Sequence, residues 1–130
     1  MTPEEQIHRT YELFNEHGGF EAVEELWHPD IEYHEAFDWP GAGTYRGREA
    51  VRARFTEYLE ALGIVRADLD RVVGSGDRLA WTVRFEGRSA AGVPNAHTWG
   101  YIGRFEDGLL VRCWAYYAAS EALDELQRED

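Results

Sequence analysis

Residues 96–118 read AHTWGYIGRFEDGLLVRCWAYYA, and this segment contains two β-rich runs that are separated by Asp107-Gly108. An Asp-Gly pair between two such runs is a strong signal for a β-hairpin. Outward from this segment, residues 64–73 and 78–88 are also β-rich, and turns of glycine, proline and polar residues bound them. Four successive strands with short turns predict an antiparallel β-meander.

The first half of the chain has a helical pattern instead. Apolar residues recur at helical intervals, and Gly18 and Gly63 stand where helices are expected to end. A strand is expected at residues 31–37, where side chains alternate between two faces. The expected helices comprise residues 3–17, 20–27, 48–62 and 121–128. Helices that precede an antiparallel meander indicate an α+β domain in which the helices lie on one face of the sheet and enclose a pocket.

Composition and charge limit the function classes. The 130 residues are 44% hydrophobic, and this length fits one domain over residues 1–130. Thirteen basic and 25 acidic residues give a net charge of -12, which repels phosphate backbones and argues against nucleic acid as a partner. The single Cys113 cannot form an intramolecular disulfide, and the sequence shows neither a signal-peptide pattern nor an apolar run of membrane-spanning length. These features predict a cytoplasmic protein with no membrane partner.

Four short motifs carry a resemblance to a known family. They are Tyr11 within the first helix, LWHPDIE at residues 26–32, YRGREAV at 45–51 and FEDGLLV at 105–111. Together they resemble the SnoaL-like and ketosteroid-isomerase-like group of the nuclear transport factor 2-like superfamily, over nearly the whole chain. The resemblance implies a cone-shaped (cystatin-like) domain whose three N-terminal helices pack on a curved antiparallel sheet. It is less specific for activity, because the superfamily includes isomerases, cyclases, dehydratases, epoxide hydrolases and non-catalytic binders.

The resemblance also implies candidate catalytic residues. Compared with ketosteroid isomerases, Tyr11 resembles the tyrosine that donates to the substrate oxyanion, and Glu35 falls where the general-base aspartate lies. Tyr101 takes the position of the second oxyanion donor, where those enzymes have a protonated carboxylic acid. His97 shares strand parity with Tyr101 and would assist acid–base chemistry, as in dehydratases of the superfamily. Polyketide aldol cyclases have their acid–base aspartate at the position that corresponds to Ala115. The resemblance therefore disfavours an aldol cyclisation by the mechanism of those enzymes.

The same comparison and the strand parity predict the pocket wall. The expected ligand-binding residues are Tyr33, Phe37, Phe55, Trp81, Val83, Phe85, Trp99 and Cys113. A carboxylate in an apolar pocket can exchange protons with a substrate near neutral pH. The leading hypothesis is therefore a cofactor-independent isomerase, cyclase or lyase in which Glu35 moves a proton beside a carbonyl group.

Alternatives stay open from the residues alone. Glu35 could equally reach a solvated rim, and Tyr11, Tyr101 and His97 could be structural. A second hypothesis is a non-catalytic domain that binds a small apolar molecule, and a third is a protein-interaction module like nuclear transport factor 2. No metal is predicted, because the histidines and acidic residues at 28–34 lack a suitable ligand geometry on one strand face.

The other face of the last strand is expected to point outward. It carries Leu110, Arg112, Trp114 and Tyr116. Exposed aromatic residues there would form an apolar patch that binds a partner, and family members commonly pair sheet to sheet. We therefore expect a homodimer through the outer sheet face, unless the helix after Ser120 covers these residues.

Overall fold

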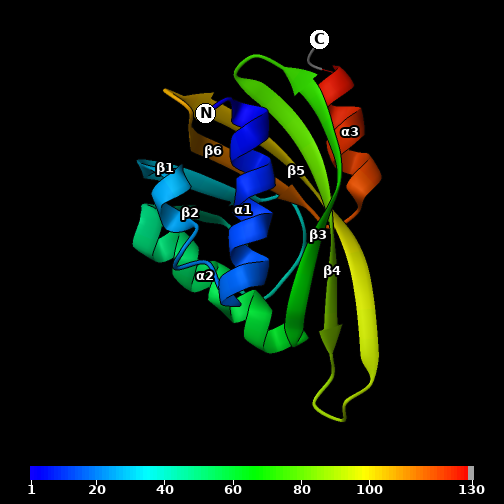
Figure 1. Cartoon of the computed structure of the whole chain (residues 1–130). Coiled ribbons are helices and arrows are strands. Elements are labelled where there is room, and N and C mark those ends of the chain that lie inside the picture. Colours follow the sequence, from blue (N-terminus) through cyan, green and yellow to red (C-terminus); the bar gives the residue numbers. More distant parts are fainter. Residues whose placement is uncertain (129–130) are drawn as a thin grey trace.

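The computed structural model describes residues 1–128 and contains three α-helices, one short 3-10 helix and a six-stranded sheet in that range (Figure 1). In chain order the elements are α1 (Pro3–His17), η1 (Glu24–Leu26), β1 (Trp27–Glu35), β2 (Thr44–Arg46), α2 (Arg48–Leu62), β3 (Ile64–Ser75), β4 (Arg78–Arg88), β5 (Pro94–Glu106), β6 (Leu109–Tyr116) and α3 (Ala119–Arg128). None of the helices in this part of the chain is long and apolar enough to cross a membrane.

The sheet is open and has the strand order β2-β1-β6-β5-β4-β3. Strands β3 to β6 form the predicted antiparallel meander, and β2 is antiparallel to β1. However, β1 pairs with β6 in parallel, so the sheet is mixed. The predicted α+β class with a curved sheet is confirmed, and the prediction of a wholly antiparallel sheet is wrong at this one strand pair.

Local sequence signals explain where α1 and α2 begin and end. Thr2 accepts a hydrogen bond from the Glu5 amide, and the Glu5 carboxylate accepts one from the Thr2 amide, which forms a capping box before α1. Gly18 ends α1 in the left-handed conformation with φ 75°. Gly63 ends α2 at φ 61°, and a Cβ atom at this position would lie 1.9 Å from the Arg88 carbonyl oxygen. Both predicted helix ends are confirmed.

The predicted helix over residues 20–27 is wrong. Only Glu24–Leu26 form a 3-10 helix, and Trp27 already begins β1. The physical reason is sheet pairing, because Trp27 is already paired with Leu110 of β6 and the helical turn must end at Leu26. Two N-terminal helices, and not three, therefore pack on the sheet.

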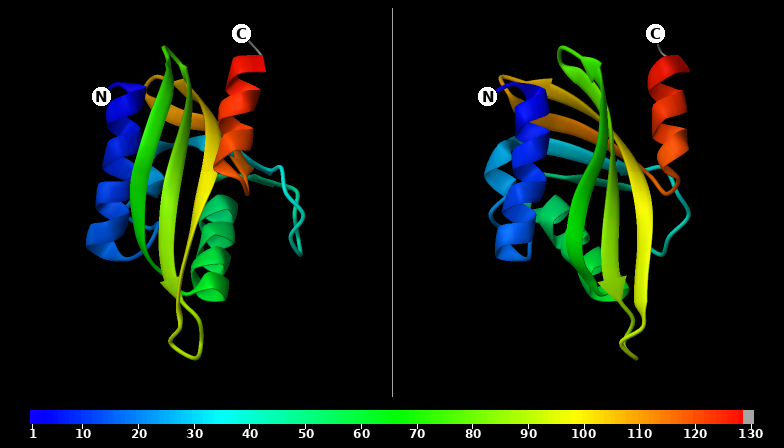
Figure 2. Two further views of the ribbon diagram at one scale, coloured as in Figure 1. Left: turned by 90° about the vertical axis from the view of Figure 1, so that its right-hand side faces the viewer. Right: turned by 45° about the vertical axis from the view of Figure 1, so that its right-hand side comes forward.

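The helices cover different faces of the sheet. Side chains of α1 and α2 pack into the large core on the concave face, together with the inward residues of β1 and β3 to β6. Helix α3 packs on the other face, where Ala122 and Leu126 meet Ala80 and Ile102. The left view in Figure 2 shows α1 and α3 on opposite sides of β3, β4 and β5. The concave core is where a pocket can form.

Candidate functional site

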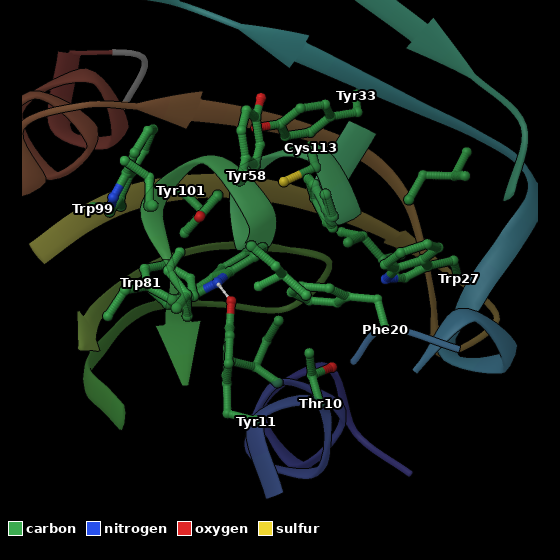
Figure 3. A pocket seen from close by; sticks show the side chains of 18 residues that line it. Thr10, Tyr11, Phe20, Trp27, Tyr33, Tyr58, Trp81, Trp99, Tyr101 and Cys113 are labelled. Atoms are coloured by element: carbon green, nitrogen blue, oxygen red, sulfur yellow. Dashed lines mark hydrogen bonds between the residues drawn. The ribbon is translucent and has the colours of Figure 1, made fainter. Parts of the chain in front are cut away.

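The main cavity lies between α1, α2 and the concave face of the sheet (Figure 3). Its volume is about 40 Å³, counted as the space open to the centre of a water molecule, which is enough for a few waters. Aromatic residues dominate its wall, namely Tyr11, Phe20, Trp27, Tyr33, Phe55, Tyr58, Trp81, Phe85, Trp99 and Tyr101. The remaining wall residues are Ile7, Thr10, Ile31, Leu59, Leu62, Ile64, Leu110 and Cys113.

The structure places most of the predicted pocket residues on this wall. Those that line the cavity are Tyr33, Phe55, Trp81, Phe85, Trp99 and Cys113. Val83 is fully buried within the core but is not among the lining residues. Phe37 lies in the loop after β1 and contacts Trp99 edge to face, with ring centres 5.1 Å apart. Whether any of these side chains binds a ligand stays a prediction.

Tyr11 and Tyr101 are two predicted catalytic residues that the structure brings to one cavity. Trp81 connects them, since its Nε1 donates to the Tyr11 hydroxyl at 2.9 Å and its ring stacks on that of Tyr101 at 5.7 Å (Figure 3). Gly103 makes room for this arrangement, because a Cβ atom there would lie 2.6 Å from the Trp81 ring. We call Tyr11, Trp81 and Tyr101 the tyrosine cluster.

Both hydroxyl groups of the tyrosine cluster have a proton to donate. Tyr11 accepts from Trp81, and within the described chain its own proton has no acceptor. The Tyr101 hydroxyl makes no hydrogen bond to any residue that the structure describes. Burial raises the pKa of both hydroxyls well above 10, and for Tyr101 the nearby Tyr11 adds to this effect. Both phenols therefore remain neutral hydrogen-bond donors at physiological pH.

A second pair of hydroxyls contributes to the same wall. Tyr33 on β1 and Tyr58 on α2 share a hydrogen bond of 3.0 Å between their hydroxyl oxygens. Burial also raises the pKa of Tyr33 and that of the Cys113 thiol. A thiol that keeps its proton is a poor nucleophile, so Cys113 acts as part of the apolar wall.

Glu35 occupies a different environment from the one expected. Its carboxylate forms a two-pronged ion pair with Arg54, with Nε to Oε2 at 2.7 Å and Nη2 to Oε1 at 3.0 Å. The side chains are 0% and 2% exposed, respectively. Glu35 is therefore shielded from water, but it does not line the cavity, and a guanidinium faces its carboxylate. The hydrogen bond to Glu35 raises the pKa of Arg54 further above its ordinary value.

His97 lies outside the cavity wall. Its ring stacks on Tyr117 with ring centres 4.0 Å apart, and its Nε2 lies 2.5 Å from the Tyr117 carbonyl oxygen. His97 contacts one residue of the cavity wall, Trp99, whose ring it meets edge to face with ring centres 5.9 Å apart. The structure thus groups Tyr11 with Tyr101, while Glu35 and His97 lie elsewhere.

The sequence prediction missed Arg54 and Tyr58. Both lie on the buried face of α2 together with Val51. Because they follow Val51 by three and seven residues, the helical spacing already indicated that they lie on the same face as Val51. An arginine on the buried face of a helix needs an acidic partner, so recognising Arg54 as buried would have indicated an ion pair.

Fewer residues point outward from β6 than the sequence predicted. Leu110 lines the cavity, because the pairing of β5 with β6 shifts register between Arg104 and Phe105 and turns Leu110 inward. Its predicted outward position is therefore wrong. Trp114 does lie on the outer face, where its ring stacks on His34 with centres 5.5 Å apart. Trp114 and Tyr116 are partly buried against the cluster that includes Ala122 and Leu126 of α3, so the last helix covers part of the predicted patch. The homodimer through this face stays a prediction.

Metal ligands are not grouped in the described part of the chain. No set of three or more histidine, cysteine, aspartate or glutamate side chains is placed there to share an ion. On the outer face, His34 Nε2 lies 3.8 Å from Glu32, whose carboxylate already pairs with Arg46 and Arg112. The arrangement is an ion-pair network of the surface.

Comparisons with solved structures extend this description. TerC, co-crystallised with polyporic acid, superposes with a TM-score of 0.77 at 21% identity, covering 97% of this chain and 98% of that chain. A protein with a cystatin-like fold from Xanthomonas campestris gives 0.72 at 23% identity, with 95% and 96% covered. A protein with a ketosteroid-isomerase-like fold from Catenulispora acidiphila, in complex with trimethylamine, gives 0.70 at 17% identity, with 95% and 92% covered. The predicted cystatin-like fold is therefore confirmed.

Sequence comparison identifies the family. The comparison with curated proteins gave no match. The family description that matches this chain is the SnoaL-like domain, over residues 7–113. This match spans most of the chain, from α1 to the middle of β6. The chain therefore belongs to the SnoaL-like domain family.

Proposed function

We propose that this protein binds a small, mainly apolar molecule that carries a carbonyl or similar acceptor oxygen, and that Tyr11 and Tyr101 donate hydrogen bonds to that oxygen. The observation that carries this proposal is two neutral phenols with unused protons in an aromatic cavity. Both phenols line the cavity, so a ligand oxygen there can accept from them, and each such hydrogen bond contributes roughly 0.5–1.5 kcal/mol. The apolar remainder of the ligand is favoured by burial against the rings.

The cavity wall also indicates where the pocket can enlarge. At about 40 Å³ the cavity must expand before it admits a two-ring molecule. Phe55, Leu59, Leu62 and Ile64 are partly exposed wall residues along α2 and at the start of β3. Rotamer changes in such residues are fast and inexpensive compared with changes in the core of the sheet. We therefore expect ligand entry from the side of α2.

Structures with the same fold support small-molecule binding. One of them, TerC, was co-crystallised with polyporic acid, and the ketosteroid-isomerase-like protein was in complex with trimethylamine. Their identities to this chain are below 25%, so they support the kind of site and not the identity of its ligand.

Binding of α-tetralone and tetralin tests this proposal. The two molecules share a fused-ring skeleton and differ by the carbonyl oxygen, and tryptophan fluorescence reports their dissociation constants. We expect Tyr101→Phe to weaken α-tetralone binding roughly 2- to 12-fold, the value of one hydrogen bond, and to leave tetralin binding unchanged. Tyr117→Phe is the matched control, since Tyr117 is 50% exposed and does not line the cavity. Equal effects of Tyr101→Phe on both molecules would contradict the proposal.

A second candidate is proton-transfer catalysis of the isomerase, cyclase or lyase type. The observation in its favour is the same pair of neutral phenols, because such donors can stabilise an enolate oxygen. In this scheme Glu35 is the general base, and it must first leave Arg54 to reach a substrate. The pair therefore makes binding the better-supported function.

Isotope exchange separates catalysis from binding. Proton NMR of α-tetralone in heavy water measures loss of the protons beside the carbonyl. Catalysed exchange that disappears in Glu35→Gln, with binding retained, would establish Glu35 as the base. If the bound ketone exchanges its protons at the uncatalysed rate, catalysis is contradicted and the protein is a binding domain.

A further inference from the structure

The Glu35–Arg54 pair is buried where the chain leaves β1. Besides Glu35, the Arg54 guanidinium donates from Nη1 to Glu57 at 3.1 Å. It also lies over the rings of Tyr45 and Tyr58, at 5.2 and 5.1 Å from their centres. A buried ion pair is kept only where its geometry is good and its remaining donors are satisfied. Both conditions hold here, so the position of the pair is well fixed.

The pair also contacts the loop of residues 36–43, which joins β1 to β2. Glu35 Oε1 accepts from the Gly43 amide at 3.2 Å, and Arg54 Nη2 donates to the Pro40 carbonyl oxygen at 3.2 Å. Figure 2 shows this connection as an extended loop at the edge of the molecule. Most of its residues are exposed. The Tyr45 hydroxyl also donates to the Gly41 carbonyl oxygen at 2.6 Å, and backbone hydrogen bonds hold the two ends of the loop. The ion pair thus supplies two of the hydrogen bonds that position a loop with little burial of its own.

Two aromatic residues of the loop pack behind the pocket wall. The Phe37 ring lies 5.1 Å from that of Trp99 and 6.4 Å from that of Tyr58, and the Trp39 ring lies 6.1 Å from that of Tyr58. Tyr58 and Trp99 line the cavity, whereas Phe37 and Trp39 do not. The loop is thus a second layer, and this part of the wall cannot move outward while the loop stays in place.

We propose that the Glu35–Arg54 pair holds the 36–43 loop behind Tyr58 and Trp99 and thereby limits the size of the molecule that the pocket admits. The size limit rests on the proposed function, since the cavity must be the binding site. The pair acts as a positioning element that contacts the loop and does not contact the ligand. Glu35 then serves the site by its position in the fold, independently of any proton transfer.

Hydrogen exchange tests the effect of the pair on the loop. In Arg54→Gln we expect the hydrogen-bonded amides of the loop, those of Ala42 and Gly43, to exchange roughly tenfold faster, because local opening becomes easier. Amides at the centres of β4 and β5 serve as the internal reference, which separates local opening from global unfolding. Arg52→Gln is the matched control, since Arg52 lies on the same helix and pairs with Glu24 instead, at 2.9 Å.

Ligand size tests the consequence for the pocket. We expect α-tetralone, with two rings, to bind the unmodified protein better than anthrone, with three. Arg54→Gln and Phe37→Ala should each raise the affinity for anthrone relative to α-tetralone by roughly tenfold, the effect of relaxing a pocket wall. Phe37→Ala keeps the ion pair intact, so it tests the same wall if Arg54→Gln does not fold.

The outcomes distinguish this inference from the proposed function. Failure of α-tetralone to bind the unmodified protein would contradict the proposed function and, with it, the size limit. Binding of α-tetralone together with unchanged loop exchange in Arg54→Gln would overturn the inference alone. An unchanged size preference in both Arg54→Gln and Phe37→Ala would overturn it as well.

Discussion

The tyrosine cluster and the Glu35–Arg54 pair are both polar groups removed from water, but they use their hydrogen bonds differently. Both oxygens of Glu35 accept hydrogen bonds, and Arg54 donates to two carboxylates and a carbonyl group. Tyr11 and Tyr101, in contrast, keep protons for which the described chain supplies no acceptor. The comparison teaches that buried polar groups with all their hydrogen bonds made hold a structure in place, while hydroxyls that line a cavity with a proton to spare are available to a ligand.

Removal of Arg54 should have the largest effect on stability. Arg54→Gln leaves the carboxylate of Glu35 buried without its partner, and loss of one member of a buried pair costs roughly 3–5 kcal/mol. Urea unfolding measures the free energy of unfolding. The control Arg52→Gln breaks a partly exposed pair and should cost less than about 1 kcal/mol. Similar losses in the two variants would show that Glu35–Arg54 is no more structural than a surface pair.

Tyr11 and Tyr101 should differ in stability although both line the cavity. Tyr11→Phe removes the acceptor for Trp81 Nε1 and leaves this buried N–H unsatisfied, at a cost of roughly 1–3 kcal/mol. Tyr101→Phe removes a hydroxyl without a partner and should change the free energy of unfolding by less than about 0.5 kcal/mol. Urea unfolding of the two variants provides the measurement. A large loss in Tyr101→Phe would mean that its hydroxyl is already used within the fold.

Gly103 provides a test of how the tyrosine cluster is positioned. Gly103→Ala places a methyl group 2.6 Å from the Trp81 ring, so the indole must shift. Overpacking of this kind costs roughly 1–3 kcal/mol and should also weaken α-tetralone binding, because Trp81 orients Tyr11. Unfolding and binding measured on the same variant check both effects. Unchanged binding would show that the position of Trp81 does not matter for the site.

Alkaline pH should lower the stability of the folded protein, because its buried thiol and phenol groups stay protonated. The pKa values of Cys113, Tyr11, Tyr33 and Tyr101 are raised in the folded protein from ordinary values of 9.0 for the thiol and 10.0 for the phenols. The unfolded chain therefore loses these protons first, and stability falls as the pH rises above about 9. Each group contributes a slope of about 1.4 kcal/mol per pH unit.

Tyr101→Phe isolates one of these contributions. The variant should lose stability less steeply than the unmodified protein above about pH 10, by the slope of one group. Urea unfolding over this pH range gives both slopes. Equal slopes would mean that Tyr101 ionises in the folded protein as readily as in the unfolded chain.

The sequence predicted the parts of the fold that have local signals. Gly18 and Gly63 mark helix ends because the left-handed conformation there suits glycine. Asp107-Gly108 marks the last hairpin for a similar reason. The three-residue strand β2 and the parallel pairing of β1 with β6 were not predicted. They depend on contacts between distant segments, which leave no local pattern.

The candidate site was predictable only in part, for the same physical reason. The helical spacing correctly turned Tyr11 inward, and strand parity did so for Tyr101. Parity failed for Leu110, because a register shift reverses the faces of a strand. The partner of Glu35 could not be found from its own strand, since Arg54 lies 19 residues further along the chain.

The most direct test of the central claim is the infrared carbonyl stretch of isotope-labelled α-tetralone bound to the protein. A carbonyl oxygen that accepts hydrogen bonds from phenols in a mainly apolar cavity should absorb at lower wavenumber than the same ketone in an apolar solvent. We predict this shift in the unmodified protein and its partial reversal in Tyr101→Phe. A bound carbonyl that absorbs as in an apolar solvent, and does not respond to Tyr101→Phe, would contradict the claim that these tyrosines hold the ligand's oxygen.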